Sequence, residues 1–180
     1  MKDIRVTPIR NGTVIDHLPA GSVTYVLRIL GYYNNENPIG NTTSILMHAP
    51  SRKTFWKDML KIEDRELVER ERQKIALVAW TYKPRQMPTL NIIRNYAVAE
   101  KEILGLAKCY KDIVRCQNGL DEGEKGGCIS NSERWMQGTT LELQNDKFYC
   151  YYCGQEQKPE DLRRNIVRSP VASRKIGTSA

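Results

Sequence analysis

Apolar positions follow the period of a helix in one early segment and of strands in several others. Between Ser22 and Gly31 they recur at the spacing of one helix face, with Ser22 as a start signal and Gly31 as a stop. Asp64 can begin a second helix, expected from Arg65 to Ala79. Short β-branched or apolar runs predict strands at residues 4–9, 42–47, 59–62 and 90–98.

Two local signals refine this pattern. Asn11-Gly12 predicts a tight hairpin turn, after which Thr13–Ile15 returns as a short addition. The strand at Thr42–Met47 is expected to end at Pro50. The order β-α-β-β-α-β that results predicts an α+β fold class, a ferredoxin-like sandwich of one sheet with two helices on one face. Residues 1–105 are assigned to this N-terminal unit.

The second part of the chain carries all five cysteines. Thr139–Leu143, a turn at Asn145-Asp146 and a return at Lys147–Cys150 predict a hairpin that arrives at Cys-x-x-Cys-Gly. Residues 106–157 are therefore predicted to form a small, all-β, zinc-ribbon-like domain. Residues 118–127 read as a solvated glycine-rich loop, and residues 158–180 as a basic, flexible tail.

The cysteine spacing predicts a structural zinc site with one ion per chain. Cys150 and Cys153 form a Cys-x-x-Cys pair, and Cys116 and Cys128 form a second pair with eleven residues between them. Four thiolates complete the tetrahedron that Zn²⁺ favours, and a domain of this size has too small a core to fold easily without such a staple. The alternative is a set of buried free thiols. Cys109 is expected to be a packed thiol and not a ligand.

Composition excludes several classes of protein. The longest apolar run has six residues, from Ile75 to Trp80, and is too short to cross a membrane. The charged N-terminus predicts no secretory signal, hence a cytoplasmic location. The net charge is +7, but the tail contributes six basic residues against two acidic ones. The body is thus only mildly basic, and nucleic-acid binding is not expected from charge alone.

No catalytic constellation is present in the sequence. There is no phosphate-binding Gly-rich loop ending in Lys-Ser/Thr and no Ser or Cys nucleophile motif. The two histidines are His17 and His48. We therefore predict that the isolated chain is not an enzyme.

Three strings of the N-terminal unit, residues 10–20, 57–63 and 91–98, together with the order of the paired cysteines, resemble the regulatory chain of aspartate carbamoyltransferase. The resemblance covers about residues 4–155. It implies a nucleotide-binding allosteric domain at residues 1–105 and a zinc domain that contacts the catalytic chain. It also implies a regulatory-chain homodimer, joined at the edge strand around Thr42–Met47. The implied effectors are CTP, ATP or UTP, with Mg²⁺ as an accompanying ion.

The same resemblance implies roles for individual residues. Lys61 and Lys101 correspond to phosphate-binding cations, and Asp16 and His17 face the ribose and phosphates. The positions that match the base pocket and its surroundings are Val6, Ile9, Met59, Asn91, Ile93, Tyr96 and Val98. From spacing alone, the apolar members of this set are core residues and the lysines are solvated.

Two other functions are consistent with parts of the sequence. A zinc-ribbon nucleic-acid-binding adaptor would account for the basic tail and an isoelectric point near 9.2. A small-molecule-binding domain of the amino-acid-sensing kind would share the predicted order of strands and helices.

Overall fold

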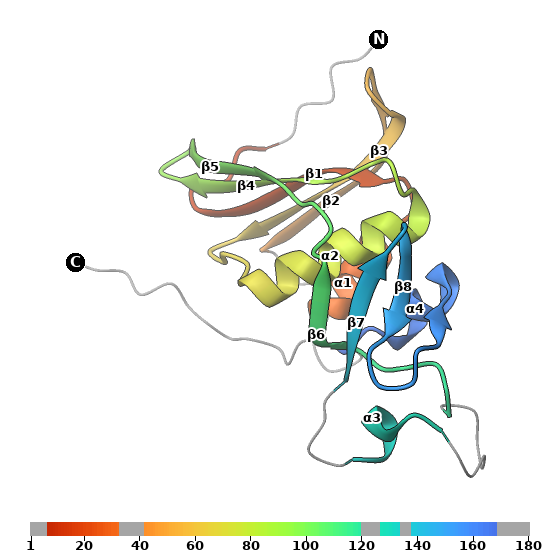
Figure 1. Ribbon diagram of the computed structural model, residues 1–180. Helices are drawn as coiled ribbons and strands as arrows, with labels where there is room; N and C mark the ends of the chain where they lie inside the picture. The colour runs from red at the N-terminus through yellow and green to blue at the C-terminus, as the bar shows by residue number, and fades with distance from the viewer. Residues whose placement is uncertain (1–6, 33–41, 120–126, 134–137, 169–180) are drawn as a thin grey trace.

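The computed structural model describes residues 7–32, 42–119, 127–133 and 138–168. Val6 and the start of the predicted first strand lie outside this part, as do most of the predicted glycine-rich loop and the tail beyond residue 168. The fold is mixed α+β with two antiparallel sheets, as Figure 1 shows. The strand order is β2-β3-β1-β4-β5 in the first sheet and β6-β7-β8-β9 in the second.

The central strand of the first sheet is β1 (Gly12–Pro19), which pairs with both β3 (Phe55–Glu63) and β4 (Thr89–Arg94). The prediction that Thr13–Ile15 is only an addition to a hairpin is therefore wrong. Gly12 opens this strand with a φ of 134°, a conformation that favours glycine. Residues 7–10 form no strand.

The two edges of the first sheet also differ from prediction. At one edge, β2 (Thr43–Ser51) continues through Pro50, because an edge strand tolerates a residue without a backbone N–H. At the other edge, the strand predicted at residues 90–98 is a hairpin of β4 and β5 (Ala97–Ile103). Asn95 and Tyr96 turn the chain, with φ values of 51° and 65°.

Helix α1 (Val23–Ile29) confirms the first predicted helix, and Gly31, with a φ of 80°, follows its end. Ser22 precedes the helix as predicted, but its side chain makes no capping hydrogen bond. Helix α2 (Glu69–Tyr82) begins four residues later than predicted. Asp64 is not its cap, because Asp64 has a φ of 53° and the chain approaches the helix in an extended form. The Glu71 carboxylate instead accepts a hydrogen bond from the Val68 backbone N–H, at 3.2 Å.

The second sheet contains β6 (Cys109–Val114), β7 (Thr139–Gln144), β8 (Lys147–Cys150) and β9 (Glu156–Gln157). The predicted hairpin of β7 and β8 is confirmed. The prediction of an all-β unit is wrong, because residues 129–132 form the one-turn helix α3 (Ile129–Ser132). Helix α4 (Pro159–Asn165) occupies the start of the predicted tail and packs on α2.

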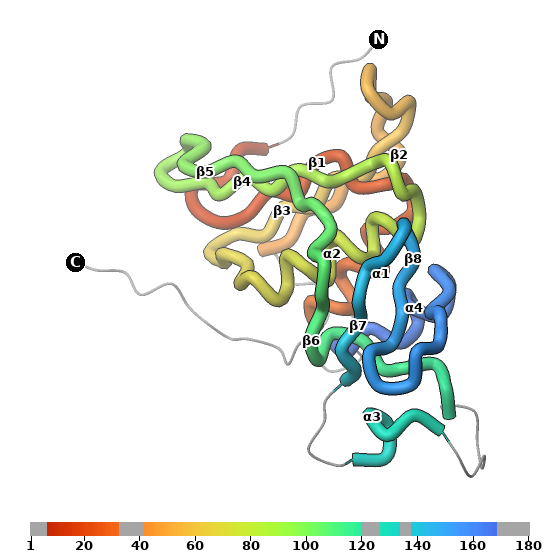
Figure 2. The backbone as a smooth tube through the Cα atoms, viewed as in Figure 1, coloured from red at the N-terminus to blue at the C-terminus, as the bar shows by residue number. Residues whose placement is uncertain are grey.

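Helix α2 joins the two sheets into one core (Figure 1). The chain passes from β5 alongside α2 into β6, as Figure 2 traces. The Trp80 ring of α2 lies 5.0 Å from the Phe148 ring of β8, centroid to centroid. Because both sheets cover α2, its buried residues are not confined to one stripe. Among the helices described, none has the length and apolar character that crossing a membrane requires.

Candidate metal centre and effector surface

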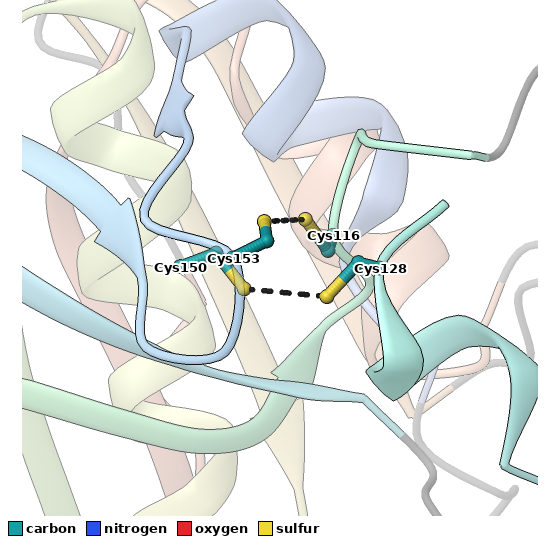
Figure 3. Close-up of side chains that lie close together, drawn as sticks. All are labelled: Cys116, Cys128, Cys150 and Cys153. Atoms are coloured by element: carbon teal, nitrogen blue, oxygen red, sulfur yellow. Dashed lines mark hydrogen bonds between the residues drawn. The ribbon is translucent and has the colours of Figure 1, made fainter. Parts of the chain in front are cut away.

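Four cysteine side chains meet at one end of the second sheet (Figure 3). Their sulfur atoms all lie within 4.8 Å of one another. The Cys116–Cys153 and Cys128–Cys150 sulfur pairs are each 3.6 Å apart, and all four residues are free thiols. The structure thus brings together the four predicted ligands. Cys109 lies outside this group on β6 with an exposed side chain, so the expectation of a packed thiol there is wrong.

The cluster has the dimensions of a tetrahedral zinc site. Zn–S bonds of about 2.3 Å place two sulfur ligands about 3.8 Å apart, which is close to the 3.6 Å that separates each of the two sulfur pairs. The donor set is also the one that structural zinc prefers. The residues present therefore fit Zn²⁺, with Cys116, Cys128, Cys150 and Cys153 as its ligands.

Tight turns bring the four sulfurs together. Gly154 has a φ of 69° and donates its backbone N–H to the Cys150 carbonyl at 2.8 Å, which closes the Cys-x-x-Cys turn. Gly119 and Gly127 cross closely before Cys128, since a Cβ on Gly119 would lie 2.5 Å from the Gly127 Cα. Side chains at these two glycines would push apart the two loop segments that carry Cys116 and Cys128.

Polar side chains surround the sulfurs. Ser130 Oγ lies 3.1 Å from Cys128 Sγ, and Thr139 Oγ1 lies 3.0 Å from Cys150 Sγ. Gln157 donates its amide N–H to Cys116 Sγ at 3.5 Å. Such groups orient metal ligands and stabilise thiolate charge. The sequence analysis did not identify them: Ser130 has a local signal, two residues after Cys128, but Thr139 and Gln157 reach the site only through the fold.

Burial sets the proton affinities of the thiols. It raises the pKa of Cys116 and Cys128 above the ordinary value of a thiol. Burial acts in the same direction on Cys150, but hydrogen bonds led by the Thr139 hydroxyl hold the pKa of Cys150 below its ordinary value. Several thiolates packed this closely need a cation between them, which a divalent metal supplies.

A row of side chains crosses the first sheet from edge to edge. The register aligns Ser44 with Lys61, Lys61 with Val14, Val14 with Asn91, and Asn91 with Lys101. Residues directly opposite one another in a sheet point to the same face. The row therefore places Lys61, Asn91 and Lys101 on one surface.

This surface is the face of the sheet away from the helices, here called the outer face. The neighbouring row, Ile15, Leu60 and Leu90, is fully or almost fully buried in the core with α1 and α2. Alternation along the strands then places Asp16, Met59, Ile93 and Val98 on the outer face as well. The remaining predicted positions lie around it: Ile9 is buried before β1, Tyr96 is exposed in the β4–β5 turn, and His17 occupies the irregularity within β1.

Asp16 and His17 form a small charged group with a residue that the sequence analysis missed. Lys57 Nζ lies 2.7 Å from the Asp16 carboxylate. His17 Nδ1 lies 3.1 Å from the same carboxylate, and burial keeps the pKa of His17 below its ordinary value. No spacing signal joins Lys57 to Asp16, because their contact depends on the register of β1 against β3.

Lys61 is held differently from Lys101. The Lys61 ammonium donates to the Thr7 carbonyl, and its side chain is mostly covered. Burial lowers the pKa of Lys61. Lys101 is exposed on β5. One cation of the outer face is thus positioned by the chain, and the other is open to solvent.

Comparison with known proteins identifies relatives along most of the chain. Residues 4–105 match the family described as the allosteric domain of the aspartate carbamoyltransferase regulatory chain. A regulatory chain of this name from Methanothrix thermoacetophila is 41% identical over 156 residues, which cover 86% of this chain and 91% of that protein. One from Saccharolobus islandicus is 37% identical over 167 residues, covering 92% and 95%, respectively. One from Saccharolobus solfataricus is 36% identical over the same length.

Proposed function

Because the chain belongs to the family of aspartate carbamoyltransferase regulatory chains, we propose that it is a non-catalytic subunit that binds nucleoside triphosphates and transmits their effect to separate catalytic chains. The observation that carries the proposal is the identity of 37–41% over most of the chain. The process served is pyrimidine biosynthesis. The relatives are named regulatory chains, which supports the absence of a catalytic role.

The outer face is the proposed effector site. Lys61 and Lys101 supply cations for the phosphates of CTP, ATP or UTP, with Mg²⁺ as an accompanying ion. The register of the sheet supports this assignment, because it aligns both lysines with Asn91 in one row. Asp16 and His17 serve the sugar and phosphates. The apolar outer-face residues and Tyr96 serve the base.

The four cysteines are the proposed ligands of one structural zinc ion. All four coordination positions are taken by protein sulfur, so the ion supplies stability and not catalysis. Ile129, Tyr151 and Tyr152 are exposed beside the cysteines, as expected of a surface that meets another chain. This end of the molecule is the proposed contact with the catalytic chain.

The proposed N-terminal architecture is the ferredoxin-like sandwich, extended by β5. The strand order β2-β3-β1-β4 and the alternation of elements support it. The β2 edge is the proposed site of regulatory-chain pairing. Its exposed backbone groups are not paired within the described chain, and Ile45 and Met47 are exposed along it.

The effector site is tested by replacing each lysine of the row. Lys61→Ala and Lys101→Ala should each weaken triphosphate binding by about 1.5–3 kcal/mol, because each removes a charge-assisted hydrogen bond. Titration calorimetry with CTP and ATP measures this loss. Lys111→Ala, an exposed lysine on β6, is the matched control. Wild-type affinity in both outer-face variants would show that the site is misplaced.

The regulatory role is tested by capture of a partner. The tagged chain should retain an aspartate carbamoyltransferase catalytic chain, and the complex should respond to nucleotide. Binding of nucleic acid that falls steeply with salt, in place of that retention, would favour the zinc-ribbon adaptor instead.

A further inference from the structure

A hollow lies on the helix side of the first sheet, where the proposed effector site makes no use of it. It has a volume of about 280 Å³ and is formed by the ends of β1 and α2 and by the β2–β3 hairpin. These segments lie at the same end of the sheet in Figure 1. Trp56 lines it and precedes Asp58 by two positions on β3. The Asp58 carboxylate accepts the backbone N–H of Gly21 and Val23 at the start of α1, which places these β3 side chains on the helix side.

Three of the eight residues that line the hollow are aromatic: Phe55, Trp56 and Tyr82. The side chains of Phe55 and Trp56 are 83% and 54% exposed, an unusual position for two consecutive large apolar residues. Phe55 also has a φ of 64°, which is strained for a bulky side chain. Aromatic walls of this kind favour a flat ring.

One residue of the wall, Gln86, has an unused hydrogen-bond acceptor. Gln86 is 5% exposed and donates its amide N–H to the His17 carbonyl at 3.1 Å. A carbonyl only accepts, so this contact fixes the amide nitrogen toward His17. The other amide atom, Oε1, is buried and has no hydrogen-bond partner among the described residues. Because Oε1 is closed to solvent in this structure, a ligand N–H group would satisfy it after a small movement of the wall of the hollow.

The charge around the hollow is positive. Lys83 lines it, and none of its described lining residues is acidic. Two carboxylates of the adjoining strands are already engaged: Asp16 pairs with Lys57, and Asp58 accepts backbone N–H groups, including that of His48 at 2.9 Å. The site therefore favours an anion over a cation.

We propose that this hollow is a second ligand site, which binds a small planar heteroaromatic anion. The ring lies against Trp56 and Tyr82, a ring N–H donates to Gln86 Oε1, and the anionic group lies near Lys83. The volume falls near the lower end for ligand pockets, which suits one ring system with one anionic group. This chemistry is shared by nucleoside monophosphates and aromatic heterocyclic carboxylates. The site goes beyond the proposed function, because it lies across the sheet from the outer face.

The test is binding of two probes to the full chain, uridine monophosphate and indole-3-acetate, by calorimetry. The uncharged controls are uridine and indole. Three variants remove one feature each: Trp56→Ala, Lys83→Ala and Gln86→Met. Trp56 and Lys83 are exposed, so these two changes keep the test valid if the buried Gln86 variant is unstable.

At least one probe should bind at a ratio of one per chain, and its affinity should fall about tenfold or more in Trp56→Ala and in Lys83→Ala. Lys61→Ala should bind that probe as wild type does, and Trp56→Ala should keep its affinity for CTP and ATP. Those two results separate this site from the effector site. The proposal is overturned if neither probe binds with a Kd below about 1 mM, if the Trp56 and Lys83 variants bind unchanged, or if the uncharged rings bind as tightly as the anions.

Discussion

At the residue scale, the backbone at Gly12 is the most demanding position of the first sheet. Its φ of 134° is a conformation that glycine adopts easily and other residues rarely adopt. A Cβ there would lie 2.1 Å from the Ile62 carbonyl oxygen. Gly12→Ala should therefore lower the free energy of unfolding by about 3 kcal/mol or more, since backbone strain and a clash with a neighbouring strand add together. Urea denaturation followed by circular dichroism measures this loss.

Gly21 supplies the matched control for that substitution. It also has a positive φ, 85°, but a Cβ there meets nothing within 4 Å. Gly21→Ala should lower the free energy of unfolding by only about 1 kcal/mol, from the strain of a positive φ in a residue with a Cβ. Equal losses in the two variants would contradict the role assigned to the close approach of Gly12 and Ile62.

Lys74 makes stability depend on pH in the alkaline range. Its side chain is buried in α2, and burial lowers the pKa of Lys74 to about 8 from 10.5. Between these values the unfolded chain holds a proton that the folded chain has lost, so stability rises with pH. The gain should be roughly 2–3 kcal/mol between pH 8 and pH 10.5.

The Lys74→Met variant isolates this contribution. Other groups titrate in both proteins, so the informative quantity is the difference in unfolding free energy between wild type and variant at each pH. That difference should change by roughly 2 kcal/mol across the range, in favour of the wild type as pH rises. A constant difference would rule out a depressed Lys74 pKa.

At the element scale, local signals predicted helix α1 and the β7–β8 hairpin, and failed where the fold supplies a second partner. Helix α1 has one buried face and clear ends, and its prediction is confirmed. Helix α2 is covered by both sheets, so its apolar positions do not follow one stripe, and its predicted start was four residues early. Strand β1 was underestimated because Gly12 looked like a turn residue, whereas its contact with Ile62 depends on pairing with β3.

The turn between β7 and β8 gives a prediction at this scale. Asn145 and Asp146 have φ values of 49° and 61°, the conformation for which Asn-Gly is favoured. Asp146→Gly should raise the unfolding free energy by about 0.5–1 kcal/mol, since glycine adopts a positive φ without strain. Thermal denaturation of the metal-loaded chain measures the change. The converse variant, Asn145→Val, should be destabilised, and stabilisation by both changes would contradict the assigned turn.

Helix α4 gives another testable prediction, because it lies where the sequence predicted a flexible tail. Leu162 is 1% exposed, and Arg163 lies over the Tyr25 and Tyr82 rings, at 5.3 Å and 4.6 Å from their centroids. Leu162→Ala should cost about 2–4 kcal/mol through loss of buried contacts. Arg164→Ala, at an exposed neighbouring position, should change stability by less than about 0.5 kcal/mol. A neutral Leu162→Ala would show that α4 does not dock.

At the scale of the whole molecule, the two candidate sites differ in how far the sequence could predict them. The four cysteines were identified from spacing and ion chemistry, and the fold gathers all of them. The outer-face residues were identified only through the family resemblance, because strand register, and not spacing, aligns Lys61 with Asn91 and Lys101. Contacts that cross between strands, such as that of Lys57 with Asp16, leave no local signal.

The positions of the two sites lead to a prediction about metal removal. The cysteine cluster lies at the end of the second sheet farther from the first, whereas the outer face is turned away from α2 and the second sheet (Figure 1). Loss of the four proposed metal–thiolate bonds would remove folding free energy from the loops that carry Cys116, Cys128 and Cys153. Chelation or Cys153→Ser should therefore release the chain from its catalytic partner, while affinity for CTP or ATP stays within about threefold of the wild type.

Size-exclusion chromatography of the complex before and after chelation, with metal analysis and nucleotide calorimetry on each fraction, measures both effects. Cys109→Ser is the matched control and should change neither, because Cys109 lies outside the cluster. An intact, nucleotide-responsive complex without metal would contradict both the structural zinc and the proposed interface. Joint loss of assembly and nucleotide binding would mean something different. It would show that the shared core around Trp80 and Phe148, whose rings lie 5.0 Å apart, makes the two sheets one cooperative unit.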